Sequence, residues 1–184
     1  CGLPPDTFSV ENGIIMSTSH RFPLLIDPQA QANKWIRNLE RENDLNTVVL
    51  SDVHYMRSLK SAIRFSTPVL IESVAEHFDM ALDPLLLKQT FRKGTTEYIN
   101  IGNEIIEFGS GFKLYITTVL PNPHFSPETA LKVTLINFMV TIDGLEDQIL
   151  ATTFAEERPE LEQKKKRLIV EGARNVQKLK ELED

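Results

Sequence analysis

Cysteine is almost absent from this chain of 184 residues, because Cys1 is the single one. A disulfide within the chain is therefore impossible, and a zinc site built from several cysteines is excluded. Such cysteine usage is typical of a reducing compartment. The four histidines, His20, His54, His77 and His124, are scattered without the spacing of metal ligands, so we expect no bound metal.

Long apolar runs are also lacking. No stretch approaches the roughly 18 apolar residues that a membrane-spanning helix needs, and no signal peptide opens the chain. The chain has fewer basic than acidic side chains, with 20 Lys and Arg and 26 Asp and Glu, so its formal net charge is −6. A nucleic-acid surface needs clustered Lys and Arg, and the one strong basic cluster, 164–167, is flanked by acidic residues. We therefore expect neither a membrane nor a nucleic acid as partner.

The composition itself is ordinary for a folded protein, with 41% hydrophobic and 25% charged residues. The length suits one α/β domain of about 150 residues with an appendage, or two very small domains. The chain begins with Cys1 rather than Met, and we expect it to be part of a longer polypeptide.

Short apolar runs alternate with helical patterns along most of the chain. The runs predicted as buried strands are 23–26, 48–50, 69–72, 114–118 and 133–140. The predicted helices cover 29–38, the segment from Asp52 to Phe65 with Asp52 as N-cap, and 82–91. Strands that alternate with helices indicate crossover connections, so the expected fold class is α/β with a five-stranded parallel core sheet.

Three segments fall outside this alternation. Residues 1–22 contain Pro and Ser and are predicted as irregular, with a possible short strand at 13–17. Residues 98–108 form two apolar runs joined by Gly102-Asn103, which predicts an inserted β-hairpin.

The third segment follows a predicted domain boundary that separates residues 1–145 from 146–184. Charged residues make up 16 of the 29 positions in 156–184. A narrow apolar seam runs through them, formed by Leu161, Leu168, Val176, Leu179 and Leu182. This pattern favours a long helix that pairs as a coiled-coil arm, and the alternative is a helix lying on the surface of the domain.

The first strand and helix stand where a P-loop protein holds phosphate. The P-loop pattern is G-x-x-x-x-G-K-[ST], and residues 28–35 read PQAQANKW. Lys34 matches the lysine, but Pro28 and Asn33 replace the two glycines, and Trp35 replaces the hydroxyl that binds Mg²⁺. We favour an ordinary first helical turn over a phosphate site.

Two further strand ends supply polar candidates. Glu72 ends the 69–72 strand and could bind a metal, but Ser73 follows it where a water-activating carboxylate is needed. The alternative role of Glu72 is to hydrogen-bond neighbouring loops. Thr118 stands where a polar sensor of the γ-phosphate would lie, and its alternative role is to cap the strand. Segment 126–140 contains no Arg, so it offers no arginine finger.

Several segments resemble, in order and over essentially the whole chain, the fifth AAA+ module of dynein heavy chains. They are Gly2–Pro4, Glu11–Ile15, Pro23–Gln29, Gln31–Ile36, Leu85–Phe91, Tyr115–Thr118, Val133–Val140, Gly144–Gln148 and Glu156–Glu162. The forms NKWI and LKQTF are closer to axonemal heavy chains than to the cytoplasmic one.

The resemblance implies a P-loop NTPase-like three-layer sandwich that is the large subdomain of one module in a six-module ring. It implies a degenerate nucleotide site at Asn33, Lys34, Glu72 and Thr118, with no cofactor expected and Mg·ATP bound weakly if at all. Residues from about Glu156 would begin the strut helix that supports the microtubule-binding stalk.

The partners that the resemblance implies are the neighbouring AAA+ modules, the stalk, other dynein subunits and, indirectly, the microtubule. The location it implies is the cytoplasm, the cytoskeleton and the ciliary axoneme. We expect a structural, force-transmitting module that does not itself hydrolyse ATP. The alternative is an ATP-binding regulatory or hydrolytic module.

Overall fold

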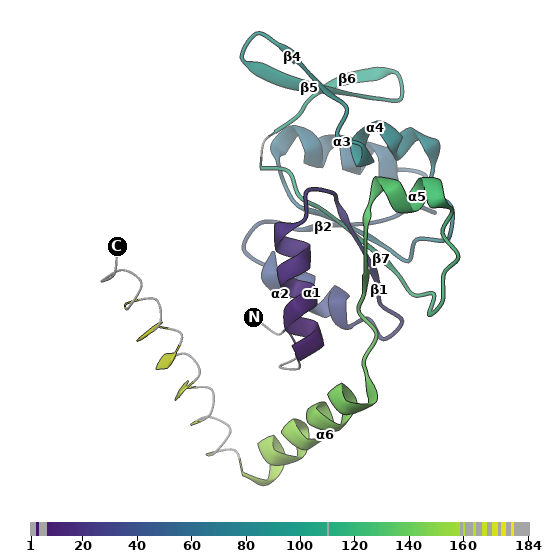
Figure 1. Ribbon diagram of the computed structural model, residues 1–184. Coiled ribbons are helices and arrows are strands. Elements are labelled where there is room, and N and C mark those ends of the chain that lie inside the picture. The colour runs from purple at the N-terminus through teal and green to yellow at the C-terminus, as the bar shows by residue number, and fades with distance from the viewer. Residues whose placement is uncertain are drawn as a thin grey trace. The chain divides into compact units, whose positions relative to one another are not determined.

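The computed structural model describes residues 3, 7–109 and 111–158, together with 160, 164, 167, 168, 171, 172, 174, 175 and 178. The chain forms two compact units, residues 1–139 and residues 140–184. Figure 1 shows the course of the chain through both units.

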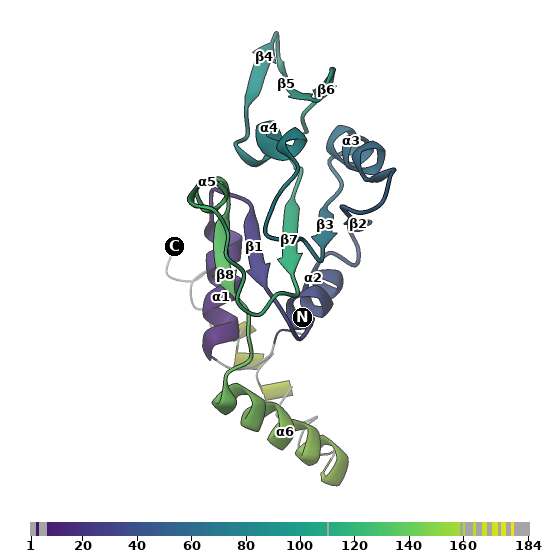
Figure 2. The same ribbon diagram turned by 90° about the vertical axis from the view of Figure 1, so that its right-hand side faces the viewer.

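The centre of the first unit is a five-stranded sheet whose strand order is β2-β3-β7-β1-β8 (Figure 2). Its strands are β1 (Pro23–Ile26), β2 (Asn46–Val49), β3 (Val69–Glu72), β7 (Leu114–Thr118) and β8 (Thr134–Asn137). All four pairings are parallel. The central strands β1, β3 and β7 are buried along nearly their whole length because helices cover the sheet on both faces. The predicted parallel core is confirmed, although β8 is shorter than the predicted 133–140.

Helices cover both faces of this sheet and make three layers. They are α1 (Thr7–Thr18), α2 (Gln31–Leu39), α3 (Tyr55–Phe65), α4 (Asp83–Leu86) and α5 (Pro127–Lys132). Residues of α1 and α2 pack against Leu25 and Leu70 in one cluster of buried side chains. Residues of α3 and α4 pack against Leu24 and Ile71 in another. The connection from β1 to β2, which contains α2, and the connection from β2 to β3, which contains α3, run in opposite directions across the sheet. Because such crossovers are right-handed, α2 and α3 lie on opposite faces.

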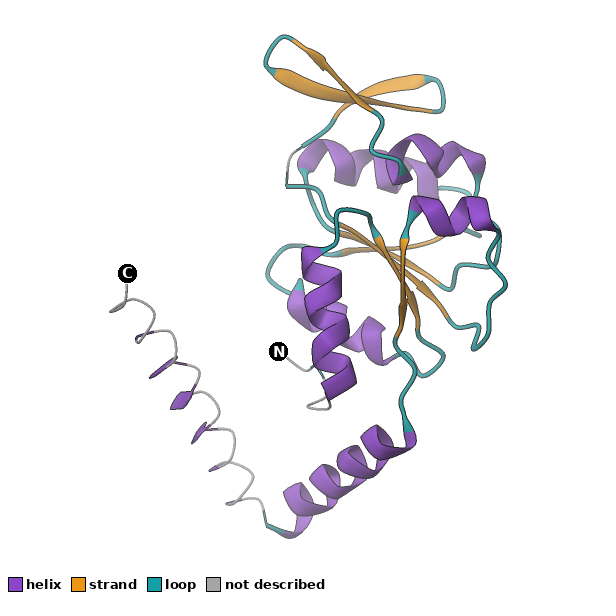
Figure 3. Cartoon of the chain, in the orientation of Figure 1, coloured by secondary structure: helices purple, strands orange, loops and turns teal. Residues whose placement is uncertain are grey.

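The predicted hairpin is confirmed and is part of a larger insertion. The strands β4 (Thr90–Lys93), β5 (Thr96–Ile101) and β6 (Glu104–Glu107) form a separate antiparallel sheet between β3 and β7 in sequence. Figure 3 shows this sheet beyond α3 and α4, away from the core sheet. Ile99, Ile101 and Ile106 join the cluster of buried side chains on that face. Gly102 has φ +65°, the left-handed conformation that the tight turn between β5 and β6 requires.

The prediction of irregular structure with a possible strand at 13–17 is wrong for residues 7–18. The short apolar stretch 13–16 suggested a strand, but it lies within the helix α1. Tertiary contacts decide the matter: Met16 is buried with Trp35, and the Asn12 side-chain amide donates to the carbonyl of Asn137 at 2.7 Å. Packing against a neighbouring element outweighs the weak local preference of two isoleucines.

Two helix predictions also need correction. The helix α3 begins at Tyr55, and His54 rather than Asp52 is its N-cap. Asp52 instead accepts the backbone N–H of His54 at 2.9 Å, which closes a turn before the helix.

The predicted helix 82–91 is a 3₁₀ turn, η1 (Met80–Leu82), followed by the single-turn α4. Lys88 ends it with φ +50°, and residues 90–93 form β4. The left-handed backbone at Lys88 turns the chain out of the helical path.

The second unit contains α6 (Ile142–Glu157). Beyond Arg158 each described residue has helical backbone, and Leu168 is exposed. The other members of the predicted seam, Leu161, Val176, Leu179 and Leu182, lie outside the described residues, so the coiled-coil arm stays a prediction. In the part of the chain that the structure describes, no helix is long and apolar enough to span a membrane.

Candidate functional site

The carboxyl ends of parallel strands meet at one edge of a sheet, which is where α/β proteins bind ligands. Here β1 lies next to β7, and β7 lies next to β3. This order brings the four predicted site residues to the same edge. Asn33 and Lys34 lie in the first turn of α2 after β1, whereas Glu72 ends β3 and Thr118 ends β7.

A fifth residue at this edge, Asp27, was missed by the sequence analysis. It follows β1 directly and is fully buried. Its carboxylate accepts the backbone N–H of Gln31 at 2.8 Å and that of Asn33 at 3.1 Å. These amides belong to the first turn of α2, where the backbone N–H groups have no acceptor within the helix and are the kind of donor that a P-loop directs at phosphate. The signal in the sequence was an Asp between an apolar strand and a helix start, where carboxylates satisfy such amides.

Burial and hydrogen bonding act in opposite directions on Asp27. Burial raises its pKa above the ordinary value, and the amides of Asn33, Gln31 and Ala32 oppose that rise because they stabilise the ionised form. The side chain is therefore an internal acceptor held in the position where a ligand anion would have to sit.

Two further residues, Pro28 and Trp35, do not supply the groups that the P-loop pattern uses at their positions. Pro28 carries no N–H that could face a phosphate. Trp35, at the position of the Mg²⁺-binding hydroxyl, is 5% exposed and stacks on Phe138 with ring centroids 5.8 Å apart. Its ring belongs to the buried cluster that also contains residues of α1 and of the sheet.

Lys34 and Asn33 differ in their surroundings although they are adjacent. Lys34 is exposed, and its backbone N–H donates to the carbonyl of Ala30. The side-chain oxygen of Asn33 is buried and has no hydrogen-bond partner among the described residues.

Glu72 is held by an ion pair with α2. One of its carboxylate oxygens lies 2.6 Å from a guanidinium nitrogen of Arg37, and the two side chains are 16% and 56% exposed. The residue thus links β3 to the helix α2, whereas its expected alternative role was to hydrogen-bond neighbouring loops. Ser73, next along the chain, has φ +56° and contributes no carboxylate.

Thr118 is fully buried and its hydroxyl is engaged on both sides. It donates to the carbonyl of Val74 at 2.7 Å and accepts the N–H of Leu120 at 3.3 Å. Its own carbonyl accepts the N–H of Asp27 at 2.8 Å. This arrangement caps the end of β7 and connects it to β1. Across the described residues, no group of three or more His, Cys, Asp or Glu side chains is placed to hold a metal ion.

Comparison with known proteins agrees with this fold. The whole chain, residues 1–184, matches the family described as the ATP-binding dynein motor region. It is 54% identical over 183 residues to "Dynein axonemal heavy chain 3" of Mus musculus and to that of Homo sapiens. It is 52% identical over the same length to "Dynein axonemal heavy chain 1" of Mus musculus.

Each of these alignments covers 100% of this chain and 4% of the relative, so the chain spans a small part of the length of the heavy chains it matches. The parallel sheet and the match over every residue together lead to one conclusion. The chain belongs to the dynein motor-region family and has the α/β architecture of an AAA+ domain.

Proposed function

We propose that this chain is a structural, force-transmitting AAA+ module of a dynein heavy chain and does not itself bind or hydrolyse ATP. One observation carries the proposal: the carboxylate of Asp27 already accepts the amides of Gln31 and Asn33 at the start of α2. A phosphate at this position would have to displace a buried carboxylate. If both were present, two anions would share a site of low dielectric constant, where like charges repel strongly.

The residues around this carboxylate support the same conclusion, because they do not fit Mg·ATP. Trp35 offers no oxygen to Mg²⁺ and is packed on Phe138. Glu72 is engaged with Arg37, and the hydroxyl of Thr118 is engaged with Val74 and Leu120. Ser73 stands where Walker B chemistry requires a carboxylate to activate water.

The second candidate function is an ATP-binding regulatory module. Two observations favour it: Lys34 is exposed at the lysine position of the P-loop register, and Glu72 ends a strand of the same sheet edge. The family description also names ATP binding, which applies to the motor region as a class. A lysine alone attracts phosphate as a point charge, but it replaces neither the amide cradle nor the Mg²⁺ ligand.

Within the whole motor, we place this chain as the fifth module of the ring, with the residues after about 156 beginning the strut. Its partners in this proposal are the neighbouring modules, the stalk and other dynein subunits, and it acts on the microtubule through the stalk. The identity to axonemal heavy chains supports a place in the ciliary axoneme.

A lysine substitution in the intact motor tests the proposal. Lys34→Ala removes the one P-loop residue that this module retains, and its exposed position makes the change harmless to folding. We expect microtubule-stimulated ATPase activity and gliding velocity to equal those of the parent. Lys93→Ala, which changes an exposed lysine of β4, is the matched control. A loss of activity in Lys34→Ala alone would favour the ATP-binding reading.

A further inference from the structure

A cavity of about 580 Å³ lies at the edge of the sheet opposite to the candidate site. It opens at the amino ends of β1 and β7, where Phe22 and Phe112 precede the strands. The end of α1, the residues after α2 and Lys88 complete its wall. Its volume falls within the roughly 300–1,000 Å³ of small-molecule sites in proteins.

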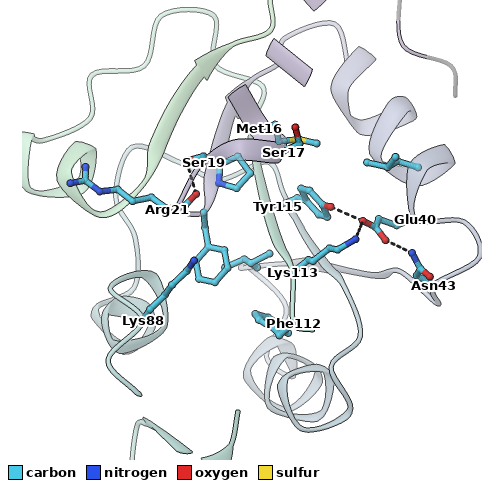
Figure 4. A pocket seen from close by; sticks show the side chains of 14 residues that line it. Met16, Ser17, Ser19, Arg21, Glu40, Asn43, Lys88, Phe112, Lys113 and Tyr115 are labelled. Carbon is cyan, nitrogen blue, oxygen red and sulfur yellow. Dashed lines mark hydrogen bonds and ion pairs between the residues drawn. The ribbon is translucent and has the colours of Figure 1, made fainter. Parts of the chain in front are cut away.

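One wall of the cavity is a preformed polar cluster around Glu40, which is 1% exposed (Figure 4). The Tyr115 hydroxyl and the Lys113 ammonium donate to one carboxylate oxygen at 2.6 and 2.9 Å, and the Asn43 amide donates to the other at 2.6 Å. Burial by itself would raise the pKa of Glu40, but these hydrogen bonds and the Lys113 charge hold it below its ordinary value. The only carboxylate among the described lining residues is therefore ionised and already neutralised.

The opposite wall is aromatic and carries a second ammonium. Lys88 lies with its nitrogen 4.7 Å from the centroid of the Phe22 ring, and it donates to the backbone carbonyl of His20. Phe112 contacts Phe22 edge to face, with centroids 6.2 Å apart. An ammonium has three N–H donors, so Lys88 keeps two beyond the one given to His20.

The side chains thus divide the cavity by chemistry. Figure 4 shows Lys88 and Lys113 entering from different sides, whereas the guanidinium of Arg21 points away. The rings of Phe22, Phe112 and Tyr115 also line the cavity. Because Glu40 is paired within its own cluster, Lys88 leaves the cavity with an unneutralised positive charge, in a chain whose net charge is −6.

We propose that this cavity is a binding site for a small organic anion, in which Lys88 and Lys113 hold a carboxylate or phosphate and the aromatic wall covers an apolar body. The site is separate from the degenerate P-loop edge, so it does not depend on whether that edge binds ATP. Charge-assisted hydrogen bonds from the two lysines would orient the bound anion. The aromatic rings would pack against its aryl or acyl part.

Saturation-transfer NMR on the intact heavy chain tests the proposal, with phenyl phosphate as the probe and the other nucleotide sites saturated with Mg·ADP. We expect binding to the parent and roughly a ten-fold or greater loss of affinity in Lys88→Met, because one charge-assisted contact is removed. Lys88→Arg keeps the charge and should retain binding. Lys93→Met, which removes an exposed lysine of β4, should leave binding unchanged.

Benzyl alcohol has an aromatic ring but no charge, so comparing it with phenyl phosphate distinguishes an anion site from an apolar cleft. We expect benzyl alcohol to bind more weakly. Equal signals from the two probes, or equal affinity in the parent and Lys88→Met, would overturn the proposal. It would also be overturned if the intact heavy chain showed no Lys88-dependent signal, since another segment of the heavy chain would then occupy the cavity.

Discussion

The Asp27 carboxylate, a single buried group, accepts backbone amides at the start of α2. Asp27→Ala removes the carboxylate that accepts the amides of Gln31 and Asn33. We expect the free energy of unfolding to fall by about 1–3 kcal/mol, the usual effect of unsatisfied buried donors. Urea denaturation measures this loss. Glu42→Ala, which changes an exposed carboxylate three residues after α2, should stay within about 0.5 kcal/mol of the parent.

Asp27→Ala should also fail to create ATP affinity, because Pro28 and Trp35 are unchanged. If the variant unfolds at the same urea concentration as the parent, the carboxylate is not a structural acceptor, and the main argument against a phosphate at this position is lost.

A second buried carboxylate, Glu40, links stability to pH. Its pKa in the folded chain lies below the ordinary value of 4.5, so the stabilisation it gives is present above that pH and lost as pH falls through the folded pKa. Glu40→Gln should therefore lower the free energy of unfolding at pH 7 by roughly 1–3 kcal/mol, because the new amide group places a donor against a donor at Asn43.

The difference between parent and Glu40→Gln should shrink steadily below pH 4.5. Thermal unfolding from pH 3 to pH 7 checks this trend, and Glu42→Gln serves as the exposed counterpart. A difference that does not depend on pH would mean that Glu40 does not titrate as its hydrogen bonds require.

At the scale of elements, α2 is anchored by Trp35, which stands where the P-loop pattern has its hydroxyl residue. Trp35→Thr would restore the P-loop hydroxyl, but it removes a ring stacked on Phe138 and packed beside Met16. We expect a loss of about 3–5 kcal/mol in the free energy of unfolding, as for other buried Trp truncations. Calorimetric unfolding measures it, and an unfolding temperature equal to that of the parent would show that the ring contributes little to the core.

The elements differ in how far the sequence predicts them. The five core strands were predictable because each is a short apolar run bounded by turn residues, and the β5–β6 turn was predictable from Gly102-Asn103. The helix α1 was not, since its apolar residues show no helical face and its position is decided by contacts with Trp35 and Asn137. The break at Lys88 depends on a positive φ at a lysine, which no local rule anticipates.

The candidate site, like the elements, could be predicted from the sequence only in part. The register of residues 28–35 against the P-loop pattern was visible in the sequence, and so was the placement of Glu72 and Thr118 at strand ends. The engagement of Glu72 by Arg37 was not visible, because the two residues are 35 apart and meet only when β3 lies beside α2. The role of Asp27 required the geometry of two backbone amides, which residue identity alone does not give.

At the scale of the whole motor, the segment after 156 is expected to pair with a returning helix and brace the stalk. Polar substitutions at Leu168, Val176 and Leu179 would remove the apolar seam without touching a nucleotide site. We expect ATP binding at the other modules to survive, while microtubule affinity stops responding to nucleotide. Microtubule co-sedimentation across nucleotide states is the assay. If the microtubule affinity of the variant still changed with nucleotide as in the parent, the segment after 156 would not transmit the nucleotide state to the stalk.

The proposed structural role depends most on this module not binding nucleotide. Calorimetric titration of Mg·ATP into the whole ring, with the nucleotide sites of the other modules inactivated, measures that directly. Loss of the amide cradle and of the Mg²⁺ hydroxyl removes several contacts of about 1.5–3 kcal/mol each, which shifts a micromolar affinity to the millimolar range or weaker. We predict no measurable heat at micromolar nucleotide. Micromolar binding that disappears in Lys34→Ala would contradict the account.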